Sequence, residues 1–447
     1  MDVKNLGPIS SGSLKLAPLT ILCGTNNQGK TYFSYALYGV MKKLPDLIVG
    51  FLDEEEYTIL RSKGSFTLPR KEFNEKIIKI VSENFHSGKY NIFNKIFNSE
   101  NDSFNDTEFL LLEEEIYSLL SLDKTTSSII KVGNTTFLLE SGEDNLTILI
   151  TNDELDDFLS SNRIKTFVDV LIKNAIRKNI SSFYIPAERL GINVFRSQLN
   201  SNKIEMLDAI NNIINSEMRS KNSIENSLIK NLASINNVYP QPINDYLEFI
   251  NDIQKYEIDD DNEVAMFIRE NIIKGRFVID SNTDKSYYRL RVGKKRYKTD
   301  LIPLHITSSS VKSIYGLDYL FEQIKLTQEN FIIIDEPEMN LHPKNQLEFA
   351  NLLDLIISKG IKVIISTHSD FLIRKVQNLM LKNEIEDNSI GLNSSNVKIY
   401  NFENSTISNI DLLADDEVFD NFNEIVDLIE NEYLDLLEMK AQINSKK

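Results

Sequence analysis

The chain has 447 residues, 41% of them hydrophobic, which is enough for a sizeable core and too much for a disordered protein. Its 66 Asp and Glu outnumber 49 Lys and Arg, and the net charge of −17 gives no general attraction for nucleic-acid phosphates. No apolar run reaches membrane-spanning length, the first residues lack a secretory signal, and the single cysteine, Cys23, excludes an intrachain disulfide framework, so we expect a cytoplasmic protein with no membrane partner.

The first 42 residues predict a strand, a loop and a helix. Residues 19–23 form an apolar run typical of a buried strand, and a glycine-rich turn follows at once. Residues 32–41 then predict a helix that is apolar nearly all round. We assign residues 1–42 to the first part of an α/β core.

Residues 43–180 differ in composition and are interpreted as an α/β insertion on that core. Acidic and aromatic helical segments alternate there with polar stretches. An amphipathic helix is predicted at residues 153–178. Three strands are predicted before it, near residues 128–131, 136–139 and 146–151.

Two further segments separate this insertion from the second part of the core. Residues 181–200 begin with a short strand at 182–185 and are assigned to a segment like a lid or Q-loop. Residues 201–270 are polar and strongly helical without a sustained heptad seam, which favours a second, helical insertion.

Residues 271–410 return to a core pattern. Two β-like stretches, 276–280 and 287–292, precede an alternation of helices and strands. The alternating elements are a helix at 310–325, a strand at 331–334, a helix at 343–358, a strand at 362–366 and a helix from 370. Strand–helix–strand alternation implies parallel strands with right-handed crossovers, and a charged amphipathic helix within residues 411–447 closes the chain. The pattern predicts an α/β P-loop core with a mixed or parallel sheet and α-rich insertions.

Residues 24–31, GTNNQGKT, match the phosphate-loop pattern G-x-x-x-x-G-K-[ST] in full. The strand before it and the helix after it are the required context, because backbone N–H groups and a helix N-terminus then face a phosphate. Lys30 is expected to reach the β- and γ-phosphates of ATP, and the Thr31 hydroxyl to ligate Mg²⁺. The predicted nucleotide contacts in this stretch are Gly24, Asn26, Asn27, Gln28, Gly29, Lys30, Thr31 and Tyr32.

A second motif, FIIIDEP at residues 331–337, places two carboxylates at the end of a buried strand, where ligands bind in open α/β sheets. Asp335 is expected to hold Mg²⁺, and Glu336 to orient or deprotonate the attacking water. The alternative is a strand that ends in an ordinary acidic turn. The phosphate loop elsewhere in the chain favours the catalytic interpretation.

Two polar segments complete the predicted site. His368, at the end of the next strand, is suited to hydrogen-bond a γ-phosphate oxygen, although a histidine at a strand end is often structural. Ser309, Ser310 and Lys312 open a predicted helix, whose hydroxyls and free amides can form an anion site. The alternative for these serines is a simple helix N-cap.

The order of these motifs, with "IIIDEPEMNLHP" followed by "ISTHSD", resembles the ABC-type ATPase heads, and more closely the stand-alone AAA-family ATPases related to OLD proteins. The resemblance covers about residues 1–40, 184–189 and 300–385. It implies that Lys30, Glu336 and His368 are catalytic and that hydrolysis is slow. Two protomers would sandwich ATP, so that Ser309, Ser310 and Lys312 contact the partner's nucleotide in a homo-oligomer, either a dimer or a ring of dimers.

The resemblance also suggests the cellular role. Only about 75 residues follow the His368 unit, too few for the Toprim nuclease domain of OLD proteins. ATPases of this kind serve two-gene anti-phage systems, and the ATPase component of the PARIS system, partnered with a Toprim-type protein, is the nearest candidate. Septu-like systems, with an HNH nuclease, come next. We therefore expect a switch ATPase that controls a separate effector, with a phage protein as a candidate trigger.

Three features leave alternatives open. A DNA-repair or DNA-end-binding ATPase remains an alternative because of a basic segment, which also suits a solvated hairpin. Its basic residues are Arg289, Arg291, Lys294, Lys295, Arg296 and Lys298. A transporter subunit is disfavoured because no L-S-G-G-Q signature occurs. Glu188 and Arg189 are candidates for coupling the nucleotide to the insertion, and a structural pairing of the two is the alternative.

Overall fold

A computed structural model of the chain describes residues 1–87, 92–99, 103–120, 127–152, 161–179, 182–196, 239–251, 262–280, 285–292, 297–323, 330–413, 430–434 and 436–437. Most of the helical region predicted at 201–270 lies outside these residues, as do the start of the helix predicted at 153–178 and most of the C-terminal helix. Lys294, Lys295 and Arg296 of the basic segment also lie outside them.

A nine-stranded mixed sheet forms the centre of the molecule, in the order β5-β1-β2-β16-β15-β3-β14-β13-β9. Its strands are β1 Asp2–Leu6, β2 Ile9–Ser13, β3 Leu19–Gly24, β5 Glu108–Leu110, β9 Ser182–Ile185, β13 Phe331–Asp335, β14 Lys362–Ser366, β15 Val397–Glu403 and β16 Thr406–Ile410. The five strands from β15 to β9 are parallel, whereas β15–β16, β1–β2 and β1–β5 are antiparallel pairs. The predicted α/β class with a mixed sheet is confirmed.

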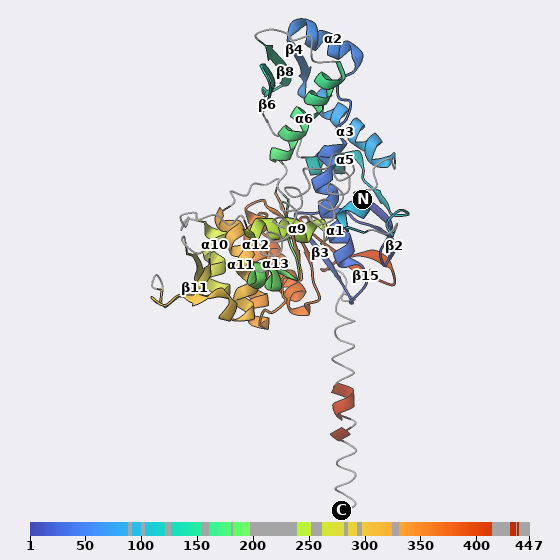
Figure 1. Cartoon of the computed structure of the whole chain (residues 1–447). Coiled ribbons are helices and arrows are strands. Elements are labelled where there is room, and N and C mark those ends of the chain that lie inside the picture. The colour runs from blue at the N-terminus through green and yellow to red at the C-terminus, as the bar shows by residue number, and fades with distance from the viewer. Residues whose placement is uncertain are drawn as a thin grey trace, which may run out of the picture.

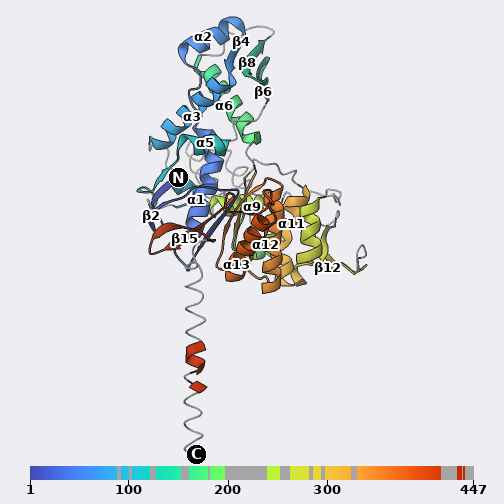
Figure 2. The ribbon, with the colours of Figure 1, turned by 180° about the vertical axis from the view of Figure 1, so that it is seen from behind.

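Helices cover both faces of this sheet, as Figures 1 and 2 show from opposite sides. The helix after the glycine-rich loop, α1 Lys30–Lys43, packs on one face, and α11 Ser309–Gln323, α12 Pro343–Ser358 and α13 Asp370–Ile385 pack on the other. The side chains of β13 alternate between the two cores: Ile333 faces the first and Ile332 the second. This alternation explains why the strand is apolar throughout.

A separate lobe stands above the central sheet in Figure 1. It is built around a four-stranded antiparallel sheet in the order β4-β8-β7-β6. Its elements, and those that join it to the core, are η1 Leu44–Leu47, α2 Glu54–Lys63, β4 Ser65–Pro69, α3 Arg70–His86, α4 Ile92–Ile96, α5 Glu113–Leu120, β6 Ser128–Val132, β7 Thr135–Ser141, β8 Asn145–Asn152 and α6 Ser161–Asn179. The three strands predicted here are confirmed, and β5, from the same stretch of chain, instead extends the central sheet by pairing with β1.

A third, three-stranded sheet lies beside α11, in the order β10-β11-β12. The elements of this region are α9 Gln241–Asn251, α10 Glu263–Phe267, η2 Ile268–Ile272, β10 Gly275–Ile279, β11 Ser286–Leu290, β12 Ile302–Pro303 and η3 Leu304–Ile306. The predicted β stretches at 276–280 and 287–292 are thus confirmed, each shifted toward the N-terminus.

Helix α11 is fixed from two sides. The Phe277 ring of β10 meets the Tyr315 ring edge-on, with centroids 5.0 Å apart. Arg269 is buried and pairs with Asp318 at 3.0 Å and with Glu322 at 2.9 Å. No helix among the described residues has the length and apolarity needed to cross a bilayer.

Candidate functional site

The glycine-rich loop follows β3 and requires glycine at two positions. Gly24 and Gly29 have φ angles of 123° and 97°, which L side chains rarely adopt. A Cβ would lie 2.2 Å from the Phe402 carbonyl oxygen at Gly24, and 2.6 Å from Ile9 at Gly29. The loop is therefore held closely between β2 and β15, with its amides at the start of α1.

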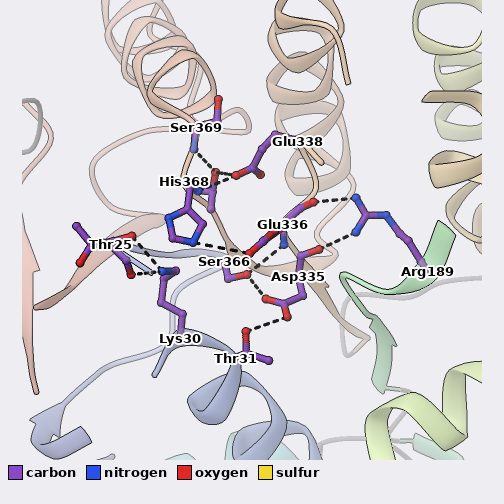
Figure 3. A network of polar contacts seen from close by, with 12 residues as sticks. Thr25, Lys30, Thr31, Arg189, Asp335, Glu336, Glu338, Ser366, His368 and Ser369 are labelled. Atoms are coloured by element: carbon purple, nitrogen blue, oxygen red, sulfur yellow. Dashed lines mark hydrogen bonds and ion pairs between the residues drawn. The ribbon is translucent and has the colours of Figure 1, made fainter. Parts of the chain in front are cut away.

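Lys30 is the first residue of α1 and is only 5% exposed. Its Nζ donates hydrogen bonds to the carbonyl oxygens of Gly24, at 3.0 Å, and Thr25, at 2.8 Å (Figure 3). Burial lowers the pKa of Lys30, and the nearby Glu336 carboxylate opposes this shift. A buried ammonium that bonds only loop carbonyls among the described residues suits an oxyanion, so the loop fits a phosphate group.

Four other residues predicted to contact the nucleotide, Asn26, Asn27, Gln28 and Tyr32, do not share the buried position of Lys30. Asn26 and Asn27 are exposed, while the Gln28 Oε1 accepts a hydrogen bond from the Ser405 N–H at 3.5 Å. The ring of Tyr32 stacks on Phe97, with centroids 5.6 Å apart. Its side chain therefore contributes to packing between α1 and the neighbouring lobe.

Asp335 lies at the end of β13 and is 1% exposed. Its Oδ2 accepts a hydrogen bond from the Thr31 hydroxyl at 3.1 Å, and its Oδ1 accepts one from the Ser366 hydroxyl on β14. Burial raises the pKa of Asp335, and these two hydrogen bonds partly offset the shift. The hydroxyl and carboxylate oxygens are the ligand type that Mg²⁺ prefers, so Thr31 and Asp335 fit this metal.

Glu336 follows in a left-handed conformation with φ of 45°, which is uncommon for a residue with a side chain. Its N–H donates to the Ser366 carbonyl oxygen at 3.1 Å, and its side chain is 32% exposed. Its Oε1 lies 3.7 Å from the Nε2 of His368. The turn thus buries the carboxylate of Asp335 and leaves the carboxylate of Glu336 accessible.

His368 is electrically neutral at pH 7. Burial, and then the charge of Lys30, lower its pKa to about 4. The approach to Glu336 is therefore not an ion pair at neutral pH. A neutral imidazole beside a phosphate loop can donate one hydrogen bond to a phosphate oxygen.

Glu338 belongs to the same network, although it is not among the predicted site residues. Its Oε1 accepts hydrogen bonds from the Thr367 hydroxyl at 2.8 Å and from the His368 N–H at 2.6 Å (Figure 3). Its Oε2 is buried and has no hydrogen-bond partner among the described residues. A third acid in residues 335–338 is the only sequence signal for Glu338, and the reach of its side chain to the β14 loop depends on the pairing of β13 with β14.

Arg189 is 2% exposed, and its hydrogen bonds within the described part of the chain all go to carbonyl oxygens. Its guanidinium donates to the carbonyls of Asp335 at 2.8 Å and Glu336 at 2.7 Å, and its Nε to that of Ser313 in α11 at 3.1 Å. None of the described hydrogen bonds or ion pairs joins Arg189 to the exposed Glu188, so the alternative of a structural pair of the two is wrong. Arg189 instead joins the acidic turn to α11.

The structure brings together Lys30, Thr31, Asp335, Glu336 and His368. The remaining predicted residues lie at the start of α11, where Ser309 is exposed and Ser310 and Lys312 are half-buried. No hydrogen bond within the described part of the chain joins their side chains to the phosphate loop or to the acidic turn.

The chain is similar to one protein family and to several solved structures. A family model described as "AAA ATPase domain" matches residues 1–373. The chain matches no curated protein sequence. Among solved structures it is similar to the Smc head domain of Pyrococcus furiosus, which has an extended coiled coil and is bound to the C-terminal domain of ScpA. The identity is 12% and the TM-score is 0.31, and the match covers 95% of this chain and 98% of that chain. An SMC head domain from Thermotoga maritima matches at 12% identity and a TM-score of 0.29, covering 92% and 97%. A third match, an SmcHead bound to the C-winged helix domain of ScpA, has 10% identity and a TM-score of 0.32, covering 92% and 95%. The family assignment rests on the family model.

Proposed function

The chain belongs to the AAA ATPase domain family, and from this premise we propose that it binds ATP with Mg²⁺, hydrolyses it slowly, and uses the nucleotide to switch its assembly with other chains. The observation that carries the proposal is the 3.1 Å contact between Thr31 and Asp335 beside the buried ammonium of Lys30. A hydroxyl, a carboxylate and a cation beside a glycine-rich loop at a helix N-terminus match the needs of a nucleoside triphosphate and its metal.

Each polar side chain has a distinct part in the proposed hydrolysis. Lys30 binds phosphate oxygens, and Thr31 and Asp335 hold Mg²⁺, which would neutralise charge on the phosphates. Glu336 is accessible and orients or deprotonates the attacking water. Neutral His368, close to Glu336, donates a hydrogen bond to the terminal phosphate. The exposure of Glu336 and the burial of Asp335 support this division.

We assign the second half of the site to another copy of the chain. Ser309, Ser310 and Lys312 lie at the surface at the N-terminus of α11, where free amides and the helix dipole favour an anion. No hydrogen bond among the described residues joins their side chains to the phosphate loop of their own chain, which supports a contact in trans. ATP would then close a homodimer, or a ring of dimers, by lying between two protomers.

For the cellular role we propose a bacterial anti-phage system in which a separate effector, such as a Toprim or HNH nuclease, is held until a trigger such as a phage protein arrives. The ATPase component of the PARIS system is the nearest candidate. The described residues build the core, the adjoining lobe and a small third sheet. In the proposed system the effector chemistry belongs to another chain in the cytoplasm.

The trans arrangement is tested by mixing two inactive variants. Lys30→Ala lacks the phosphate-loop cation, and Ser310→Arg blocks the start of α11. In an equal mixture half of the dimers are heterodimers with one intact site each, so about a quarter of wild-type hydrolysis should return. Lys63→Ala, on the distant α2, is the control and should hydrolyse ATP like the wild type. No recovery in the mixture would contradict the sandwich.

The switch is tested separately by light scattering and by phage challenge. ATP, but not ADP, should increase the molar mass of the wild type and of Glu336→Gln, which should remain assembled longer. Lys30→Ala should neither assemble nor protect cells, and affinity purification of Glu336→Gln from the native host should recover the effector. If Lys30→Ala protects cells as well as the wild type, the nucleotide switch has no part in defence. If the wild type itself gives no protection, the defence role is wrong even where ATP hydrolysis is established.

A further inference from the structure

The three-stranded sheet β10–β12 has one face packed on α11 and one face turned away from it. Phe277 and Tyr288 point inward, and Phe277 meets Tyr315 of α11. Strand alternation then directs Arg276, Tyr287 and Arg289 to the outer face. In Figure 1 this sheet lies at the edge of the molecule, on the side away from β2.

Two arginines lie side by side on the outer face. Arg276 is directly opposite Arg289 in the antiparallel register, so their Cβ atoms are about 5 Å apart. Like charges at such a position destabilise a sheet. The Nε atoms of both residues are buried and have no hydrogen-bond partner among the described residues. Unsatisfied buried donors and facing like charges both cost free energy, and an anion bound at the two half-buried guanidinium groups would offset that cost.

The surroundings of the pair are basic and aromatic. The described residues between 274 and 298 include six Lys or Arg against one Asp, in a chain whose net charge is −17. Glu270 pairs with Arg291 at 2.7 Å, but no carboxylate in the described part of the chain pairs with Arg289. The guanidinium of Arg276 lies over the ring of Tyr297, 4.6 Å from its centroid.

We propose that the outer face of β10–β12 binds the phosphodiester backbone of a nucleic acid. Guanidinium groups bind phosphate oxygens with paired hydrogen bonds, which would satisfy the two arginines and relieve their repulsion. A run of positive charge along one hairpin suits a polyanion better than a single small anion. Tyr287, on the same face, offers a ring for base stacking. The inference is independent of the proposed defence role, because it uses none of the residues of the nucleotide site.

The test measures binding of the full chain to a fluorescent oligonucleotide by anisotropy, as the salt concentration rises from about 50 to about 200 mM. Single-stranded DNA, duplex DNA and single-stranded RNA of one sequence form separate arms, and poly-glutamate serves as competitor. Arg276→Gln/Arg289→Gln removes the pair. Arg61→Gln/Lys63→Gln on α2 removes the same charge at the far end of the molecule. Thermal melting of each variant verifies folding, and Arg276→Lys/Arg289→Lys keeps the charge.

The wild type and the α2 control should bind at low salt, with affinity that falls as salt rises. The glutamine variant should bind at least about tenfold more weakly, with a salt slope smaller by about 2, and the lysine variant should recover part of the loss. Tighter binding of single strands than of the duplex would identify stacking as part of the site. Equal binding by the glutamine variant and the control would overturn the proposal, as would no binding at low salt or competition by poly-glutamate as effective as by nucleic acid.

Discussion

The hydroxyl of Thr31 donates a hydrogen bond to the carboxylate of Asp335 at 3.1 Å, although 304 positions separate them in the sequence. Strand β14 lies between β3 and β13, so the two strands that lead to these residues are not neighbours. The contact forms because α1 begins over the carboxyl ends of the parallel strands, as crossover connections in such sheets require. Sequence pieces from opposite ends of the chain thus form one site.

Asp335→Asn is expected to abolish Mg²⁺-dependent hydrolysis without weakening the fold. The amide oxygen can still accept the Thr31 hydrogen bond, and the Ser366 hydroxyl can turn to accept one from the amide N–H. The amide lacks the charge that a divalent cation needs. Because burial raises the pKa of Asp335, ionising it at pH 7 costs the folded state free energy, and the neutral amide removes that cost. Phosphate release should fall at least about 100-fold, with an equal or higher Tm. A clear fall in Tm would instead give Asp335 a structural role.

The imidazole of His368 should titrate near pH 4 in the protein without nucleotide, because its pKa is lowered to about 4. NMR titration of the four histidines checks this, with His368→Gln assigning the resonance. The unfolded chain, with a histidine pKa of 6.5, binds a proton between pH 4 and 6.5 that the folded protein does not. Stability should therefore rise with pH across this window and flatten above it, and the rise should be smaller in His368→Gln. A titration near pH 6.5 would contradict this description of the site.

Glu338→Ala should slow hydrolysis more than it weakens ATP binding. The substitution removes the acceptor that holds the Thr367 hydroxyl and the His368 N–H, so the imidazole loses its fixed position. We expect kcat to fall about 10- to 100-fold with KM for ATP little changed, as misplacement of a reacting group by about 1 Å predicts. Glu338→Gln keeps one oxygen acceptor and should retain more activity. Glu55→Ala, on the exposed side of α2, is the control. Equal kcat values for the Glu338 variants and this control would show that Glu338 does not position His368.

Arg189→Lys should destabilise the protein by at least about 3 kcal/mol, because one ammonium cannot satisfy the carbonyls that the buried guanidinium serves. Arg177→Lys provides the matched control. Arg177 pairs with Asp46 at the surface, where both side chains are more than a third exposed, so its loss should change stability by less than about 1 kcal/mol. Urea unfolding measures both free energies. If both variants lost the same small free energy of unfolding, the carbonyls around Arg189 would be satisfied without its guanidinium, and the prediction would be wrong.

Elements with strong local signals were predicted to the residue. Helix α12 spans Pro343–Ser358 and β14 spans Lys362–Ser366, as expected. Pro343 fixes the first turn of α12, and Gly360 follows its end with φ of 79°. These signals act within a few residues of the chain and need no knowledge of the tertiary structure. The glycine-rich loop and the acidic strand were recognisable for the same reason.

Features that depend on distant pairing were not predictable. Strand β5 joins the central sheet only through its register with β1, and nothing in the residues 108–110 distinguishes an edge strand of the core from a strand of the lobe. Arg189 was selected as a candidate, but its acceptors are carbonyls, which every residue carries. Its true partners become visible only when β9, β13 and α11 lie together. Glu338 was missed for the same physical reason.

Helix α11 is held in place by contacts at Ser313 and Tyr315, which are two residues apart. The carbonyl of Ser313 accepts a hydrogen bond from Arg189, and the ring of Tyr315 packs against Phe277 in the arginine-bearing sheet. A close-packed helix moves as one body, so if a nucleotide binds its first turn in trans as proposed, a displacement of that turn would also displace β10. Thermodynamic linkage then requires reciprocity. If ATP changes the affinity of the outer face for its ligand by some factor, binding of that ligand changes the affinity of the protein for ATP by the same factor.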